Sequence, residues 1–229
     1  MTCLRSFTDT SQAGLYNFMY DGTRRVFLIN TPGFDDTKRS DTDVSKDIAY
    51  HLSKTHEQGL SLAGIIYLHR ITHVRMSGSA FKNLKMFGKL CGEERSDVFK
   101  HVVLATTMWG NLTGGLNNSR ADGEYRQAQL LETKEWWGLM HQRGSPIYEY
   151  DDSTESALGI VSYVVGLKTK VVLDIQKQMI DNCQSLENTS AGQEVEKELQ
   201  EIRQKHQKEL KDIEAEKEAA LADKDEEVY

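Results

Sequence analysis

The sequence predicts an α/β protein with a doubly wound sheet, followed by a long helix and a charged coiled-coil-like tail. Two strand-like runs flank Asp21-Gly22, a pair typical of a hairpin turn. Strand-like apolar segments then alternate with segments that repeat apolar residues every three or four positions. This alternation is typical of sheets whose two faces are covered by helices.

The expected elements follow from these periodicities and from the turn residues between them. The hairpin is expected to form the antiparallel edge of the sheet. In chain order we expect strands at 16–20 and 24–29, a helix at 40–56, a strand at 63–68, a helix at 79–91, a strand at 102–105, a loop at 111–123, a helix from 125 to about 140, a strand at 147–150 and a helix from 154.

Capping residues predict several helix ends. Ser40 or Asp41 is expected to cap the first helix, and Gly92 is expected to end the second. The apolar repeat of the last domain helix continues to Met179, so we expect one long helix to leave the domain near Lys168. The resulting parts are a partial domain at 1–167, a helical extension at 168–190 and a charged helical tail at 191–229.

The charge of the chain is concentrated in this tail. Of the net charge of -7, most lies between Glu194 and Glu227, where 13 acidic and 7 basic side chains occur. The rest of the chain is nearly neutral, which argues against nucleic-acid binding. The three cysteines are far apart, and no apolar stretch is long enough to span a membrane. We therefore expect a cytoplasmic protein with reduced thiols and no transmembrane segment.

Three motifs carry a family resemblance. The stretch Asn30-Thr31-Pro32-Gly33-Phe34-Asp35-Asp36 follows an apolar strand, Tyr67-Leu68-His69-Arg70-Ile71 forms the next one, and Thr106-Thr107-Met108-Trp109 ends a third. In this order they resemble the P-loop G-domain (GTP-binding) proteins of the septin, chloroplast-import-receptor and GIMAP group. The resemblance covers Leu4 to about Val165 and implies a P-loop NTPase-like sheet that binds GTP and Mg²⁺.

The resemblance also implies site residues. Thr8 and Asn30 would face Mg²⁺, and the backbone N–H of Gly33 would meet a γ-phosphate. The implied nucleotide-binding residues are Thr8, Asn30, Thr31, Pro32, Gly33, Thr106, Thr107, Met108 and Trp109. Trp109 would either stack on a base or pack beneath its loop.

The sequence departs from the family at the positions that matter most for nucleotide binding. The 229 residues contain no G-x-x-x-x-G-K-[ST] loop, so the fold is expected to lack its first strand and phosphate loop, through truncation or degeneration. Asn30 stands where the family has an aspartate, and Gly110 stands where an acidic residue contacts the guanine edge. Losing that buried pairing typically costs about 1–3 kcal/mol. We therefore expect no measurable turnover.

Two functional hypotheses remain from the sequence. The first is a non-hydrolysing interaction module that dimerises or binds a protein partner through the switch (residues 30–37) and the C-terminal helix. The alternative is a GTP-binding GTPase whose P-loop lies upstream of Met1 in a longer protein. An apolar stripe in the tail fits either a short coiled coil or a solvated single helix. The stripe comprises Val195, Leu199, Ile202, His206, Leu210, Ile213 and Lys217.

Side chains near the end of the second motif are less informative. His69 and His73 are four positions apart, but His69 ends a strand, so the helical spacing of a zinc pair does not apply and no metal site is expected there. Arg70 and Arg75 could equally face phosphate or pair with surface carboxylates.

Overall fold

The described residues form two separate β-sheets. A computed structural model describes residues 14–31, 33, 40–93 and 95–226. Strands β1 (Gly14–Met19) and β2 (Arg25–Asn30) pair antiparallel, and β3 (Ile65–Arg70), β4 (Val102–Thr107) and β5 (Ile147–Glu149) pair parallel in the order β3-β4-β5. The predicted hairpin and the predicted parallel strands are confirmed.

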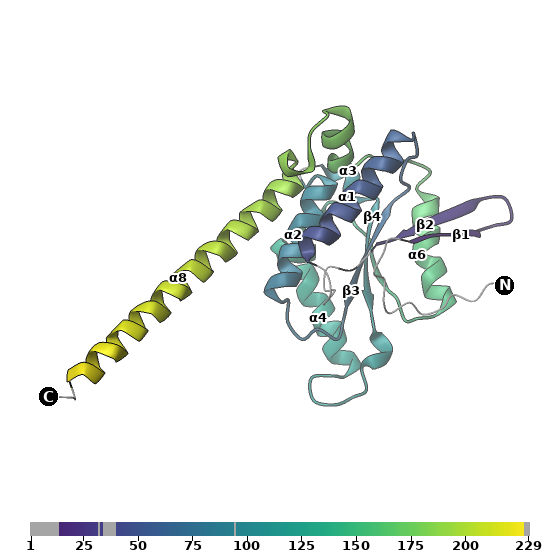
Figure 1. The fold of residues 1–229 in the computed structure, drawn as a ribbon. Coiled ribbons are helices and arrows are strands. Elements are labelled where there is room, and N and C mark those ends of the chain that lie inside the picture. Colours follow the sequence, from purple (N-terminus) through teal and green to yellow (C-terminus); the bar gives the residue numbers. More distant parts are fainter. Residues whose placement is uncertain (1–13, 32, 34–39, 94, 227–229) are drawn as a thin grey trace.

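The hairpin does not form the edge of the main sheet, so that part of the prediction is wrong. Within the described residues, β2 pairs with β1 and β3 pairs with β4, and no ladder joins the two sheets. The hairpin lies instead beside the helix α6 (Thr154–Gly166), as Figure 1 shows. The hydroxyl of Tyr20 donates a hydrogen bond of 2.8 Å to Oγ of Ser162 in that helix. This hydrogen bond joins the hairpin region to α6.

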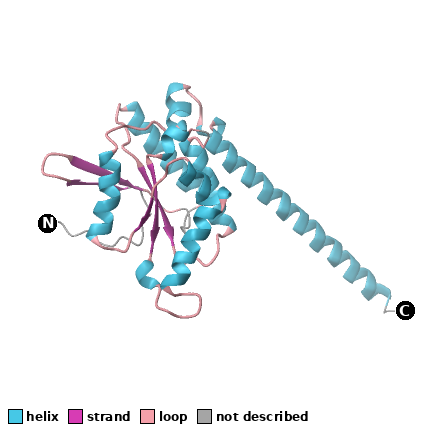
Figure 2. Cartoon of the chain, turned by 180° about the vertical axis from the view of Figure 1, so that it is seen from behind, coloured by secondary structure: helices cyan, strands magenta, loops and turns pink. Residues whose placement is uncertain are grey.

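Strand β4 is the centre of the core and is buried along its whole length. Alternate side chains of a strand point to opposite faces. Val102 and Leu104 pack into the larger cluster with residues of α1 and α2, whereas Val103 and Ala105 pack against Ile160 of α6. Figures 1 and 2 show helices on both faces of the parallel sheet. The predicted α/β class is confirmed.

Local capping explains where the main helices begin and end. Helix α1 (Asp41–Glu57) begins after Ser40, whose Oγ accepts the N–H of Asp43 at 3.1 Å. Helix α2 (Gly78–Cys91) ends at Gly92, which adopts φ +93°. Both predicted boundaries are confirmed. The shorter elements are α3 (Ser96–Phe99), the 3-10 turn η1 (Trp109–Asn111), α4 (Arg120–Glu132), the π turn η2 (Lys134–Gly138), α5 (Leu139–Gln142), α7 (Asp174–Gln176), the π turn η3 (Lys177–Asp181) and the 3-10 turn η4 (Leu186–Asn188).

The long helix expected beyond residue 168 does not form. Helix α6 ends at Gly166, and Lys168 adopts φ +54°, a left-handed conformation that interrupts a helix. The chain then returns to the domain, where Val171 bridges Leu62 and is 4 % exposed. The apolar residues that suggested a continued helix instead pack this segment into the core.

Two further boundaries differ from expectation. Helix α4 starts at Arg120, inside the predicted loop, because Ser119 and Asp122 form a capping box in which each side chain accepts the other's backbone N–H. The helix expected to continue to about residue 140 stops at Glu132, and Trp136 lies outside helical φ/ψ space. Gly138 allows the close backbone approach that follows this break, since a Cβ there would lie 2.7 Å from the carbonyl oxygen of Leu131.

The last helix, α8 (Ser190–Glu226), leaves the domain as a single rod (Figure 1). Near its start, Glu194 pairs with Lys85 of α2 at 3.6 Å. The predicted helical character of the tail is confirmed over these residues. Across the described chain, no helix is both long and apolar enough to cross a membrane.

Candidate functional site

The predicted site residues fall into two groups on different sheets. Thr8 and Pro32 lie outside the described residues. Asn30 ends β2 and pairs with Gly14 in its ladder, and Gly33 lies exposed beyond it. The second group begins at the carboxyl end of β4, the edge where open parallel sheets bind ligands.

Among the described residues, the two groups are not joined by hydrogen bonds or ion pairs. No hydrogen bond or ion pair in that part of the chain links Asn30, Thr31 or Gly33 to Thr106, Thr107, Met108 or Trp109. The sequence predicted one shared site, and the structure places its two halves on separate sheets.

Trp109 is enclosed beneath its loop. The side chain is 5 % exposed, and its Nε1 donates to Oγ1 of Thr106 at 3.0 Å. The Thr106 hydroxyl in turn donates to Oε1 of Gln127 in α4 at 2.8 Å. Of the two roles considered for Trp109, packing is therefore the one observed, and the polar atoms of Thr106 and Trp109 are engaged within the protein.

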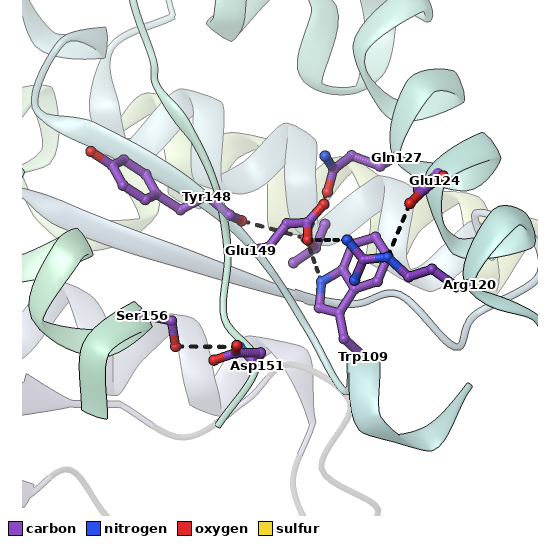
Figure 3. Close-up of polar contacts among 9 residues, drawn as sticks. Trp109, Arg120, Glu124, Gln127, Tyr148, Glu149, Asp151 and Ser156 are labelled. Atoms are coloured by element: carbon purple, nitrogen blue, oxygen red, sulfur yellow. Dashed lines mark hydrogen bonds and ion pairs between the residues drawn. The ribbon is translucent and has the colours of Figure 1, made fainter. Parts of the chain in front are cut away.

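An ion-pair network covers the enclosed ring, as Figure 3 shows. The guanidinium of Arg120 lies over Trp109, with Cζ 4.0 Å from the ring centroid. Arg120 also pairs with Glu149 at the end of β5, at 2.5 Å, and with Glu124 one helical turn on, at 3.0 Å. The hydrogen bond that Arg120 donates to the Glu149 carboxylate raises the pKa of Arg120.

Tight backbone geometry holds this loop in place. Met108 adopts φ +63°, which starts the turn after β4. Gly123 of α4 lets the loop approach, because a Cβ there would lie 2.6 Å from Cδ1 of Leu112 and 2.8 Å from the Trp109 ring. The loop is therefore packed closely against α4.

A second loop, after β5, lies on the same side of the sheet. Oδ1 of Asp151 accepts the hydroxyl of Ser153 at 2.6 Å and its backbone N–H at 3.0 Å. These hydrogen bonds, the Ser153 hydroxyl first, lower the pKa of Asp151 to about 2. Figure 3 shows the backbone N–H of Asp151 donating to Oγ of Ser156, at 3.4 Å. The carboxylate of Asp151 therefore accepts its hydrogen bonds from the residues at the start of α6.

The described residues of the loop after β4 do not fit the base of a guanine nucleotide. The position of the family's guanine-binding carboxylate is Gly110, which is exposed and has open space where a side chain would begin. The carboxylates at the end of β5 and just after it, Glu149 and Asp151, are paired with Arg120 and Ser153. No group of three or more His, Cys, Asp or Glu side chains capable of holding a metal occurs among the described residues.

Comparison with solved structures decides the fold. The chain is similar to Toc33 from Arabidopsis thaliana in a dimerization-deficient mutant, with TM-score 0.54 and 10 % identity, covering 75 % of this chain and 77 % of that one. It is also similar to Toc33 in complex with Mg²⁺ and GMPPNP, with TM-score 0.53 and 11 % identity, covering 73 % and 76 %. The fold is that of a G domain. No family model matches the sequence, and a search of curated proteins finds no match.

The network around this G-domain loop contains residues that the sequence did not single out. Arg120 and Gln127 of α4 contact Trp109 and Thr106, and Glu149 of β5 pairs with Arg120. The capping pair Ser119 and Asp122 was a readable signal that α4 begins early enough to carry Arg120. Nothing in the sequence pairs Arg120 with Glu149, because that contact depends on β5 lying beside β4.

Proposed function

We propose that this chain is a non-hydrolysing interaction module on a G-domain scaffold. The observation that carries the proposal is the closed loop after β4, in which Trp109 is buried and Gly110 offers no carboxylate. A base held there would meet no acceptor for the guanine N1 and N2 hydrogens. The sequence also supplies no phosphate loop. Hydrolysis requires phosphates and metal positioned together, and this chain meets neither need.

Exposed apolar side chains support a role in protein contacts. On the hairpin, Leu15 is 66 % exposed and Phe27 is 58 % exposed, and Met19 is also exposed. On α8, Leu210 and Ile213 are each 60 % exposed. Apolar groups of this size gathered on one element commonly mark interaction surfaces. We place the partner, a second copy or another protein of the cytoplasm, on the hairpin that leads into the switch and on α8.

Phosphate release from GTP tests the proposed lack of hydrolysis. The purified chain is incubated with GTP and Mg²⁺ and compared with a Gly33→Glu variant, which places a bulky carboxylate where a phosphate would approach. We expect both proteins to release phosphate at the rate of buffer alone. Turnover by the parent chain that the variant abolishes would contradict the proposal and would exclude a contaminating enzyme as its source.

A second candidate is a GTP-binding GTPase whose phosphate loop lies upstream of Met1. The separation of the two sheets favours it, because Phe27 of β2 and Leu68 of β3 are exposed, at 58 % and 60 %, on strands that share no ladder. A strand supplied between these sheets would cover apolar surface and satisfy backbone groups. In that protein Asn30 and Thr8 would face Mg²⁺, and guanine recognition would still lack a carboxylate at Gly110. The nucleotide titration at the end of the Discussion separates the two candidates.

A further inference from the structure

A cavity of about 430 Å³ opens beyond the carboxyl end of β3, between the loop that follows the strand and helix α4. Its volume lies within the roughly 300–1,000 Å³ of small-molecule sites. None of the nucleotide-binding residues implied by the family resemblance lines it. The cavity is therefore a candidate site in its own right.

The lining is basic and contains no acidic residue. His69, His73, Arg75 and Arg126 all contribute to it, whereas no Asp or Glu does. Arg75 is exposed at the rim, so its guanidinium can turn towards a ligand. A cavity with this charge favours an anion.

Arg126 is fixed at the inner wall. The residue is 7 % exposed, its Nη1 donates to the carbonyl oxygen of Ile71 at 2.9 Å, and its Nη2 donates to that of Asn117. In the described part of the chain no ion pair reaches Arg126. The nearby Asp122 carboxylate is held by the capping box of α4. Arg126 is thus hydrogen-bonded to neutral carbonyl groups, and its charge also helps to lower the pKa of the Asp122 carboxyl.

Aromatic and apolar groups form the rest of the wall. Tyr125 of α4 and Val74 of the preceding loop are 66 % and 56 % exposed, and Trp136 lines the far side. Trp136 has φ -95° and ψ -113°, outside the helical region, at the break between α4 and α5. The wall therefore provides planar surfaces for a flat or branched apolar body.

We propose that this cavity binds a small organic anion, a carboxylate carried on an aromatic or branched apolar body. Arg75 and Arg126 supply the positive charge, and Tyr125, Val74 and Trp136 contact the apolar body. The site lies on the α2–α4 side of the sheet and operates whether or not the scaffold binds nucleotide. Arg75 sets the preference for a charged ligand because it is the exposed cation at the rim.

Ligand-observed NMR titration of the full chain tests this proposal with 2-naphthoate and its neutral analogue 2-naphthamide. Three variants are compared with the parent. Arg75→Gln removes the rim charge, Tyr125→Ser removes an exposed aromatic contact, and Arg203→Gln is the control because it removes a charge from the solvent-exposed part of α8. All three side chains are exposed, so folding is retained.

We expect saturable binding of 2-naphthoate that weakens by about tenfold in Arg75→Gln and is unchanged in Arg203→Gln. Binding of 2-naphthamide should be weak and equal in the parent and in Arg75→Gln, whereas Tyr125→Ser should weaken both compounds. Absence of saturable binding would overturn the proposal. So would equal affinity for the two compounds, or equal effects of the two arginine variants.

Discussion

The guanidinium of Arg120 lies 4.0 Å from the centroid of the Trp109 ring and joins that ring to Glu149 of β5. Through this contact, α4, β5 and the loop after β4 form one unit on the side of the sheet where a G domain would hold its base. Side chains of the protein therefore fill the space beneath the loop after β4. This packing is the main physical reason to expect weak nucleotide binding.

The ring should contribute far more to stability than the cation that covers it. Trp109 is buried, so Trp109→Ala should lower the free energy of unfolding by about 3–5 kcal/mol. Arg120 is half exposed and its ion pairs are screened, so Arg120→Ala should cost only about 1 kcal/mol. Urea denaturation followed by far-UV circular dichroism measures both. Equal losses in the two variants would mean that Trp109 is not packed as described.

Gly123 should be intolerant of a methyl group even though alanine favours helices. A Cβ at this position would lie 2.6 Å from Leu112, so Gly123→Ala should destabilise the protein by about 1–3 kcal/mol despite its better helix propensity. The matched control is Gly159→Ala in α6, where nothing lies within 4 Å of the new carbon. That variant should gain up to about 1 kcal/mol, as helix propensity alone predicts. A gain in both variants would contradict the close packing of the loop on α4.

The hydrogen bonds to Asp151 should make one contribution to stability pH-dependent. Its pKa is lowered to about 2 in the folded chain, below the value near 4 of an unfolded aspartate. A depressed folded-state pKa stabilises the protein above the unfolded value, and that contribution is lost as pH falls through the folded value. Asp151→Asn should therefore be less stable than the parent at pH 7, with a difference that shrinks as pH falls from about 4 towards 2. Thermal unfolding at several pH values measures it, and a constant difference would refute the role of the carboxylate charge.

The exposed stripe on α8 should govern self-association if the tail is a coiled coil. Leu210→Lys combined with Ile213→Lys should convert a dimer into a monomer in sedimentation velocity, because both substitutions would place a charged side chain in the apolar seam. Gln204→Lys with Gln207→Lys is the control, since it makes the same charge change away from the stripe. A parent chain that is monomeric at all concentrations would show that α8 is a solvated helix.

The features predicted correctly from sequence are those set by neighbouring residues. Ser40 and Gly92 mark helix ends because their bonds and φ values are local, and Asp21-Gly22 marks the hairpin for the same reason. The parallel direction of β3, β4 and β5 follows from the alternation of strands and helices.

The features that were missed depend on contacts between distant segments. The apolar repeat through Val171 and Ile175 fits a helix equally well on sequence alone, yet Lys168 turns left-handed and these residues return to the core beside Leu62. Likewise, the sequence placed Trp109 in a binding loop but gave no sign that Arg120 and Glu149 would cover it.

Titration with a fluorescent guanine nucleotide and Mg²⁺ tests the central claim most directly. The 229-residue chain is compared with a form extended upstream of Met1 to include any phosphate loop. We predict that this chain shows no saturable binding and that an extended form, if it folds equally well, shows none either, since both retain Gly110 and the enclosed Trp109. Tight, saturable binding by the 229-residue chain would contradict the claim that it does not bind guanine nucleotide. Binding by the extended form alone would establish the second candidate, a GTP-binding protein of which this chain is a part.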